Sequence, residues 1–149
     1  MTQAYISIGS NIEAKKNIAE VKKELNQLFT CTFSDNFYTQ AEGFEGKDFI
    51  NLVAGFETSL DAFRLTQTLK TLEKKIGRES NQKGMHDRVM DLDLILFGNL
   101  IMQDQGITLP SKDIEEYLFV LEPLAQIAKE KLHPVFNISF EEMLKEKSR

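Results

Sequence analysis

Residues 88–98 read RVMDLDLILFG, and this stretch decides what kind of sheet the chain builds. Its length and apolar content are typical of a buried β-strand, which we predict over residues 89–97 and expect at the centre of a sheet. Residues two apart in a strand point to the same face. The side chains of Asp91 and Asp93 should therefore project together, with the leucines alternating around them, before a turn at Gly98 and Asn99.

Two adjacent carboxylates repel each other unless a cation lies between them. A hard divalent cation such as Mg²⁺ prefers oxygen ligands and often brings substrate phosphates with it. Asp91 and Asp93 are therefore candidate metal ligands, and Arg78 and Arg88 are candidate phosphate-binding residues. A short Asp-X-Asp pattern is by itself more often a solvent-facing pair on an amphipathic strand. The apolar run beside it favours the metal, because carboxylates buried in a central strand need a partner.

Outward from this strand, the hydrophobic pattern predicts further strands and helices. We expect strands over residues 4–8, 32–38 and 49–58, with a turn at 9–11, and helices over 13–29 and 62–76, the second ending at Gly77. After a loop at 79–87 and the strand at 89–97, we expect a short strand at 100–102. Helices should follow over 114–131, interrupted near Pro123, and over 140–147.

The predicted order is β-α-β-β-α-β, the pattern of ferredoxin-like domains. We therefore predict an α+β fold, a ferredoxin-like αβα sandwich with a mainly antiparallel central sheet. At 149 residues, with 42% hydrophobic and 28% charged residues, the chain has the size and composition of a single domain over residues 1–149.

The charge and cysteine content exclude several kinds of function. A net charge of −5 argues against a general nucleic-acid binder, although a basic cluster surrounds the aspartate pair and suits a phosphorylated small molecule. One cysteine and two distant histidines offer neither a disulfide nor a zinc site. There is no signal-peptide pattern and no apolar stretch of about 20 residues, so we expect a cytoplasmic protein without membrane contact, by default a monomer. The basic cluster comprises Lys70, Lys74, Lys75, Arg78, Lys83 and Arg88.

Taken together, these motifs resemble the 6-hydroxymethyl-7,8-dihydropterin pyrophosphokinase family of the folate pathway. The resemblance implies transfer of the β,γ-pyrophosphoryl unit of ATP to the pterin's hydroxymethyl group, with release of AMP. It also implies two Mg²⁺ ions held by Asp91 and Asp93, which fits the use of metals to neutralise phosphate charge. The matching segments run almost from end to end of the chain: residues 4–11, 48–51, 57–60, 72–78, 88–98 and 118–128.

The same resemblance implies roles for further residues. Arg78 and Arg88 fall where the family places phosphate-binding arginines, and Glu73 matches a position near the nucleotide and pterin sites. Without the resemblance, Glu73 would be a solvated helix residue and the two arginines would be surface ion-pair partners.

The pterin site would take its residues from three segments. Phe49 and Phe119 match the two aromatic residues that sandwich the flat pterin ring, and Asn51 can offer a donor and an acceptor to its amide-like edge. By pattern alone, both phenylalanines would be core residues. Gln40 and Ala41 fall in a loop that should line the same pocket, although its sequence departs from the family pattern.

Other departures affect the phosphate-binding loops. Ser80 stands where the family commonly has an arginine, Met85 falls where its tryptophan is expected, and Ser111 and Tyr117 replace a phosphate-contacting histidine and arginine. Lys112 could partly substitute as a point charge. Two alternatives follow: a non-catalytic pterin- or nucleotide-binding paralogue, or an enzyme for a related pterin. An RNA-binding ferredoxin-like domain is disfavoured by the acidic charge and by the lack of an aromatic-rich signature.

Overall fold

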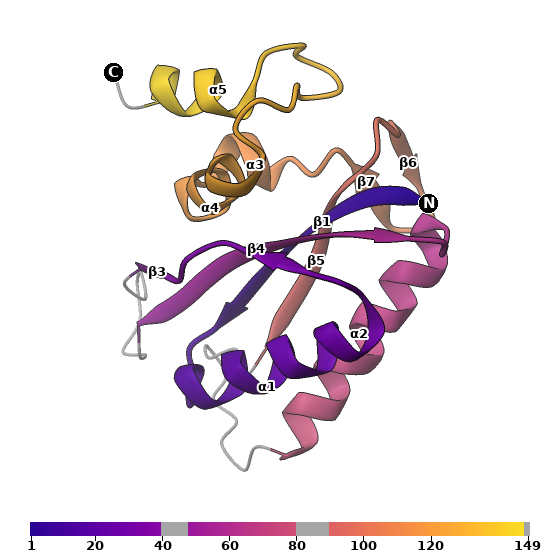
Figure 1. Cartoon of the computed structure of the whole chain (residues 1–149), viewed down its shortest axis with the longest axis vertical. Coiled ribbons are helices and arrows are strands. Elements are labelled where there is room, and N and C mark those ends of the chain that lie inside the picture. The colour runs from indigo at the N-terminus through magenta and orange to yellow at the C-terminus, as the bar shows by residue number, and fades with distance from the viewer. Residues whose placement is uncertain (40–47, 80–89, 148–149) are drawn as a thin grey trace.

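The computed structural model describes residues 1–39, 48–79 and 90–147. The chain up to Phe97 builds a sheet and two long helices (Figure 1), and the remainder adds a small hairpin and three further helices. The sheet and its two helices are β1 (Thr2–Ser10), α1 (Ala14–Leu28), β2 (Thr32–Phe33), β3 (Phe37–Thr39), β4 (Phe49–Thr58), α2 (Ala62–Glu79) and β5 (Asp91–Phe97). The remainder comprises β6 (Met102–Asp104), β7 (Ile107–Leu109), α3 (Asp113–Glu116), α4 (Leu118–Ala128) and α5 (Phe140–Lys147).

The main sheet is antiparallel throughout the described residues. Its strands follow the order β2-β4-β1-β5, and β3 also pairs with β4. Strand β1 lies in the middle, so that its residue Gly9 is paired with Asn51 on one side and with Asp91 on the other. The element order and strand order confirm the predicted α+β, ferredoxin-like arrangement.

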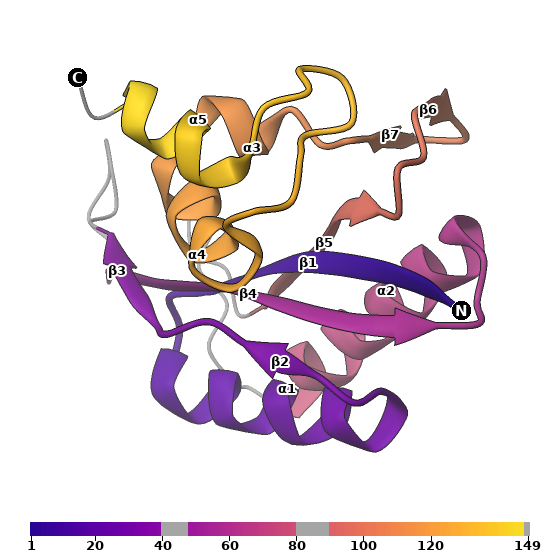
Figure 2. The same ribbon diagram turned by 45° about the horizontal axis from the view of Figure 1, so that its top comes forward.

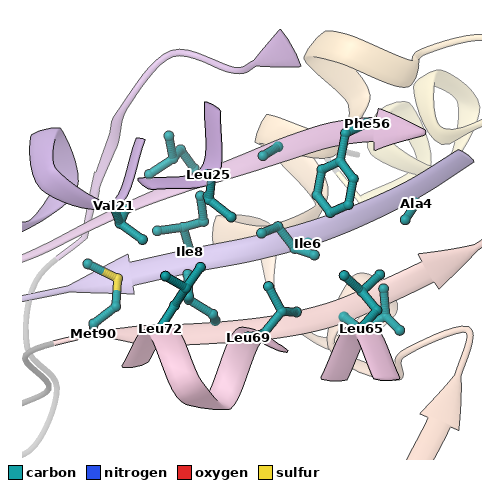
Figure 3. Packing of buried hydrophobic residues seen from close by; sticks show 14 of the residues in the cluster. Ala4, Ile6, Ile8, Val21, Leu25, Phe56, Leu65, Leu69, Leu72 and Met90 are labelled. Atoms are coloured by element: carbon teal, nitrogen blue, oxygen red, sulfur yellow. The ribbon is translucent and has the colours of Figure 1, made fainter. Parts of the chain in front are cut away.

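Helices cover both faces of this sheet (Figure 2). On one face α1 and α2 pack against the strands, and Figure 3 shows Ile6 and Ile8 of β1 between Val21 and Leu25 of α1 and the leucines of α2. On the other face α4 and α5 bury a second apolar cluster that includes Leu121. The result is a three-layered αβα sandwich, as predicted. No helix within the described ranges has both the length and the apolar character needed to cross a membrane.

Strand β5 is an edge strand, so the prediction of a central position was wrong. Among the described strands it pairs with β1 only, and its apolar run is explained by helices on both faces. A β-bulge interrupts it, because Tyr5 pairs with Leu96 while the next residue of β1 pairs with Leu94. Ile95 is the extra residue, and its carbonyl accepts a hydrogen bond from the Ser111 N–H at 2.9 Å.

The bulge changes the face to which the later residues of β5 point. Leu92 and Leu94 belong to the cluster under α1 and α2, whereas Ile95 and Leu96 belong to the cluster under α4 and α5. The expected alternation of leucines therefore holds only up to Leu94. Before the bulge, Asp91 and Asp93 point to the face opposite that of Leu92 and Leu94.

The predicted strand over residues 32–38 is divided into β2 and β3. Between them, Ser34 donates its N–H to the Val53 carbonyl and its hydroxyl accepts the Val53 N–H, both at 2.9 Å. The ladder then resumes with Phe37 opposite Asn51, so this segment carries one more residue than β4. The Gln126 side chain of α4 bonds both the backbone N–H and the carboxylate of Asp35, which fixes the break.

Several predicted boundaries were also wrong. Helix α2 continues past Gly77, where an added Cβ would meet no atom of another described element within 4 Å, and β1 continues into the expected turn as far as Ser10. The helical segment near the C-terminus is interrupted at Tyr117, which has an extended backbone, and not near Pro123, which lies within α4. The short strand expected at 100–102 begins at Met102 and forms a hairpin with β7, which the pattern did not predict.

Candidate active site

A cavity of about 110 Å³ lies where β1, β4 and β5 meet the start of α4. Complete small-molecule sites usually enclose ~300–1,000 Å³. The described residues therefore form only part of a substrate site. The lining residues are Ser7, Ile8, Gly9, Phe49, Asn51, Asp91, Asp93, Asp113, Phe119 and Val120.

The aspartate pair lies on one face of β5, as the period of a strand predicted. Both carboxylates line the cavity, with Asp91 paired in register with Gly9 and Asp93 with Ser7. The Asp93 side chain is 51% exposed, and Asp91 is half-buried. Contrary to expectation, the pair is open to solvent at the end of an edge strand, so a hydrated ion could reach it.

The donor set fits Mg²⁺. This ion keeps several water ligands and is commonly bound by one or two carboxylates together with substrate phosphates. Asp91 and Asp93 supply two carboxylates side by side on a strand. In the described part of the chain there is no larger cluster of His, Cys, Asp and Glu suited to hold a metal without a substrate.

Glu73 and Lys70 of α2 approach the pair around the free edge of β5. Glu73 accepts a hydrogen bond from the Leu92 N–H at 2.6 Å and one from the Lys70 ammonium at 3.3 Å. The Lys70 ammonium also lies 4.0 Å from the Asp93 carboxylate. Burial raises the pKa of Glu73, although the Leu92 N–H and Lys70 oppose this and Asp91 adds to it. Glu73 is thus a half-buried group beside the aspartates and does not line the cavity.

Asp113 adds a carboxylate to the cavity that the sequence did not single out. It lies at the start of α3, and its N–H donates to the Ser111 hydroxyl at 3.2 Å. Burial raises the pKa of Asp113, and the charges of Asp93 and Glu116 raise it further. The signal that could have found it is its position in the segment that returns to the bulge of β5, which only the fold reveals.

The two aromatic residues and the amide predicted for a pterin site lie in this cavity. Phe49 and Asn51 come from β4, and Phe119 comes from the first turn of α4, so segments far apart in sequence meet here. The Asn51 amide donates to the Thr39 hydroxyl at 2.8 Å, which fixes its orientation. A Cβ built on Gly9 would lie 3.2 Å from the Asn51 Oδ1, so Gly9 is another lining residue that the pattern did not identify as functional.

The remaining predicted site residues are not placed in the cavity. Lys112 is exposed and does not line it. Arg78 lies in the last turn of α2 with its side chain outside the described part of the structure. Gln40, Ala41 and Arg88 lie outside the described residues altogether.

The fold and the cavity define a ferredoxin-like α+β protein with an acidic, aromatic-lined site. The family model of 7,8-dihydro-6-hydroxymethylpterin-pyrophosphokinase (HPPK) matches residues 5–129, and the chain belongs to this family.

Several curated relatives carry the name 2-amino-4-hydroxy-6-hydroxymethyldihydropteridine pyrophosphokinase, and two of them illustrate the similarity. The protein of Haemophilus influenzae is 32% identical over 139 residues, covering 90% of this chain and 86% of the relative. That of Campylobacter jejuni is 33% identical over 135 residues, covering 83% and 82%. Among solved structures, an HPPK-DHPS protein of Plasmodium falciparum aligns with a TM-score of 0.62 and 11% identity, covering 98% of this chain and 41% of that chain. At this identity the structure supports the fold alone.

Proposed function

We propose that this protein transfers the pyrophosphoryl unit of ATP to the hydroxymethyl group of 6-hydroxymethyl-7,8-dihydropterin, a step of folate biosynthesis. The hydroxymethyl oxygen attacks the β-phosphorus and loses its proton, and the bond between that phosphorus and the oxygen bridging to the α-phosphate breaks. The products are AMP and the pterin diphosphate. Membership of the pyrophosphokinase family supports this reaction.

The observation that carries the proposal is the composition of one cavity. Asp91 and Asp93 lie in the same small volume as Phe49, Phe119 and Asn51. The first pair suits a metal that binds phosphates, and the second group suits a flat, hydrogen-bonding ring. A metal site beside an aromatic slot is what transfer of a phosphate group to a pterin requires.

Asp91 and Asp93 would hold Mg²⁺, for which the family resemblance implies two ions. When bound, these ions would neutralise part of the negative charge on the ATP phosphates that are transferred. Glu73 would help to position the two aspartates without touching the metal. Its carboxylate accepts a hydrogen bond from the Leu92 N–H and so fixes the backbone between them. Lys70 lies close enough to Asp93 to moderate the charge of the pair.

The pterin ring would lie between Phe49 and Phe119. Stacking on aromatic faces rewards a flat bicyclic ring and discriminates against non-planar acceptors. Asn51 has already donated one amide hydrogen to Thr39, so its second hydrogen and its carbonyl oxygen remain to recognise the edge of the ring. The aromatic pair orients the ring, and Asn51 selects its hydrogen-bonding pattern.

The nucleotide contacts remain proposals from the resemblance. Arg78 and Arg88 would hold ATP phosphates through paired hydrogen bonds, with Lys112 adding a charge from outside the cavity. Gln40 and Ala41 would border the pterin. We also propose a single domain over residues 1–149 that acts as a monomer in the cytoplasm, where ATP and Mg²⁺ are abundant.

The test is AMP formation from ATP and 6-hydroxymethyl-7,8-dihydropterin, with and without Mg²⁺. We expect one pterin diphosphate for each AMP, and no AMP when either the pterin or the metal is omitted. ADP in place of AMP would contradict pyrophosphoryl transfer. Pterin binding without any AMP would favour the non-catalytic paralogue, and faster turnover of another hydroxymethylpterin would favour a related substrate.

A further inference from the structure

Tyr117 and Phe119 form a stacked aromatic pair, one member of which lines the cavity. Their ring centroids are 4.9 Å apart with an interplanar angle of 22°, and the two residues are 43% and 38% exposed. Phe119 lines the cavity, whereas Tyr117 does not. We propose that Tyr117 is a positioning residue that holds the Phe119 ring ready for the pterin, an inference that rests on the proposed function.

The backbone of Tyr117 is fixed at the junction of two helices. Its N–H donates to the Asp113 carbonyl at 3.0 Å, which closes α3. Its own carbonyl accepts the Val120 N–H at 3.1 Å and the Leu121 N–H at 3.0 Å, which opens α4. With φ −127° and ψ 121°, Tyr117 is an extended residue between two helical segments. The tyrosine ring is therefore mounted on a rigid part of the fold.

The stacking leaves one face of the Phe119 ring for a ligand. Tyr117 stacks on one face of the ring, and Phe119 lines the cavity together with Phe49. We infer that a flat ligand in the cavity would stack on the other face. A half-exposed phenylalanine without such support must lose rotamer freedom when a ligand binds, which weakens binding. Tyr117 removes most of this loss before the pterin arrives.

The residue type agrees with this role. At the position of Tyr117 the resemblance led us to expect an arginine that contacts phosphate. The neighbouring turn of α3 is acidic, with Asp113, Glu115 and Glu116, and a neutral ring brings no charge to a phosphate. We infer that this position serves the pterin in this chain and not the nucleotide.

The test compares Tyr117→Ala and Tyr117→Phe with the unaltered protein. Pterin binding is measured by equilibrium titration with 6-hydroxymethyl-7,8-dihydropterin, and the KM values for pterin and ATP are measured by AMP release. Tyr117→Ala should raise the pterin Kd and KM about three- to tenfold and leave the ATP KM within about twofold. Tyr117→Phe keeps the stacked ring and should match the unaltered protein.

Phe136→Ala is the matched control. Phe136 is also half-exposed and stacks on a neighbouring ring, that of His133, with centroids 4.3 Å apart, but it does not line the cavity. This variant should leave pterin binding unchanged. If Tyr117→Ala does not fold, Tyr117→Leu keeps the apolar bulk without a ring and is expected to show the same selective loss.

Three results would overturn the proposal. The first is unchanged pterin binding in folded Tyr117→Ala or Tyr117→Leu. The second is an increased ATP KM in Tyr117→Phe, since this would assign the contribution to the hydroxyl group and the nucleotide. The third is the absence of pterin binding in the unaltered protein. Pterin binding without AMP would instead refute the proposed reaction, and the binding titrations would still decide the role of Tyr117.

Discussion

The Glu73 carboxylate accepts a hydrogen bond of 2.6 Å from the backbone N–H of Leu92, the residue between Asp91 and Asp93. Because β5 is the edge of the described sheet, this N–H points away from β1 and is available to α2. One helix side chain thereby ties α2 to the acidic end of the strand. The backbone that carries both candidate metal ligands is held from the side opposite its strand partner.

Glu73→Ala should destabilise the protein. It leaves the Leu92 N–H without its acceptor, which costs about 1–3 kcal/mol for a buried group. Glu73→Gln keeps an acceptor and should cost less. The measurement is the free energy of unfolding in urea. Glu141→Ala, which breaks the exposed 3.5 Å pair with Lys145, is the control and should cost at most about 0.5 kcal/mol. Equal losses in Glu73→Ala and Glu141→Ala would contradict the anchoring role.

Asp91→Asn and Asp93→Asn should remove activity without unfolding the protein. A bound metal is worth several kcal/mol of transition-state stabilisation, so we expect AMP release to fall about a hundredfold or more. Both residues are at least partly accessible, and the melting temperature should change little. Asp104→Asn, at an exposed position of β6, is the charge-matched control. Full activity in either site variant at low Mg²⁺ would rule out that residue as a ligand.

Gly9→Ala should weaken pterin binding selectively. The added Cβ would lie 3.2 Å from the Asn51 Oδ1, so the amide must shift by a few tenths of an ångström. Asn51 is buried and bonded to Thr39, which limits its movement, and we expect the pterin KM to rise about fivefold for a loss near 1 kcal/mol.

Gly77→Ala provides the control for that substitution. It adds the same methyl group in α2, where the Cβ would meet no atom of the described residues within 4 Å outside the helix's own backbone. It should stabilise the helix by about 0.5–1 kcal/mol and leave the pterin KM unchanged. A similar pterin KM in the two alanine variants would show that Gly9 does not constrain Asn51.

Stability should fall as the pH drops below about 6.5 because of His133. Burial lowers the pKa of this imidazole, and its Nδ1 accepts the N–H groups of Val135 and Phe136 at 3.1 and 3.2 Å. Below pH 6.5 the unfolded chain binds a proton that the folded chain resists, so the free energy of unfolding decreases until the lower folded pKa is reached.

His133→Asn tests this dependence, because an asparagine oxygen can accept the same N–H groups and does not titrate. The difference in unfolding free energy between His133→Asn and the unaltered protein should change between pH 7 and pH 5 in favour of the variant. A difference that is constant with pH would refute the assignment. The neutral form of His133 fits its surroundings. Its Nδ1 accepts hydrogen bonds, so the hydrogen of the neutral ring is on Nε2, which has no partner among the described residues.

The elements with strong periodicity could be predicted from the sequence, and so could the joint projection of Asp91 and Asp93. The position of β5 could not, because an apolar strand at the edge with helices on both faces has the same pattern as a central strand. Likewise, Gly77 permits a helix end but does not impose one. The Ser34 break depends on a side chain that replaces a backbone partner across the sheet, which no local pattern encodes.

The candidate site divides in the same way. The aromatic residues Phe49 and Phe119 were identified by resemblance, since by pattern they were core residues. Asp113 and Gly9 became visible only when the sheet register and the return of the chain to the bulge were known. The support of Phe119 by Tyr117 also required coordinates, because stacking depends on ring orientation and not on spacing alone.

The bulge at Ile95 lets one short strand obey two different selective demands. Before it, Asp91 and Asp93 face the cavity while Leu92 and Leu94 pack under α1 and α2. At and after it, Ile95 and Leu96 both pack under α4 and α5. Because Ile95 has no residue opposite it on β1, deleting it would leave Leu94 paired with Ile6 and Leu96 with Tyr5, and the two aspartates would stay in register. What a deletion would remove is the carbonyl that accepts the Ser111 N–H, so we expect length changes here to disturb the segment that carries Asp113 more than the aspartate pair on β5.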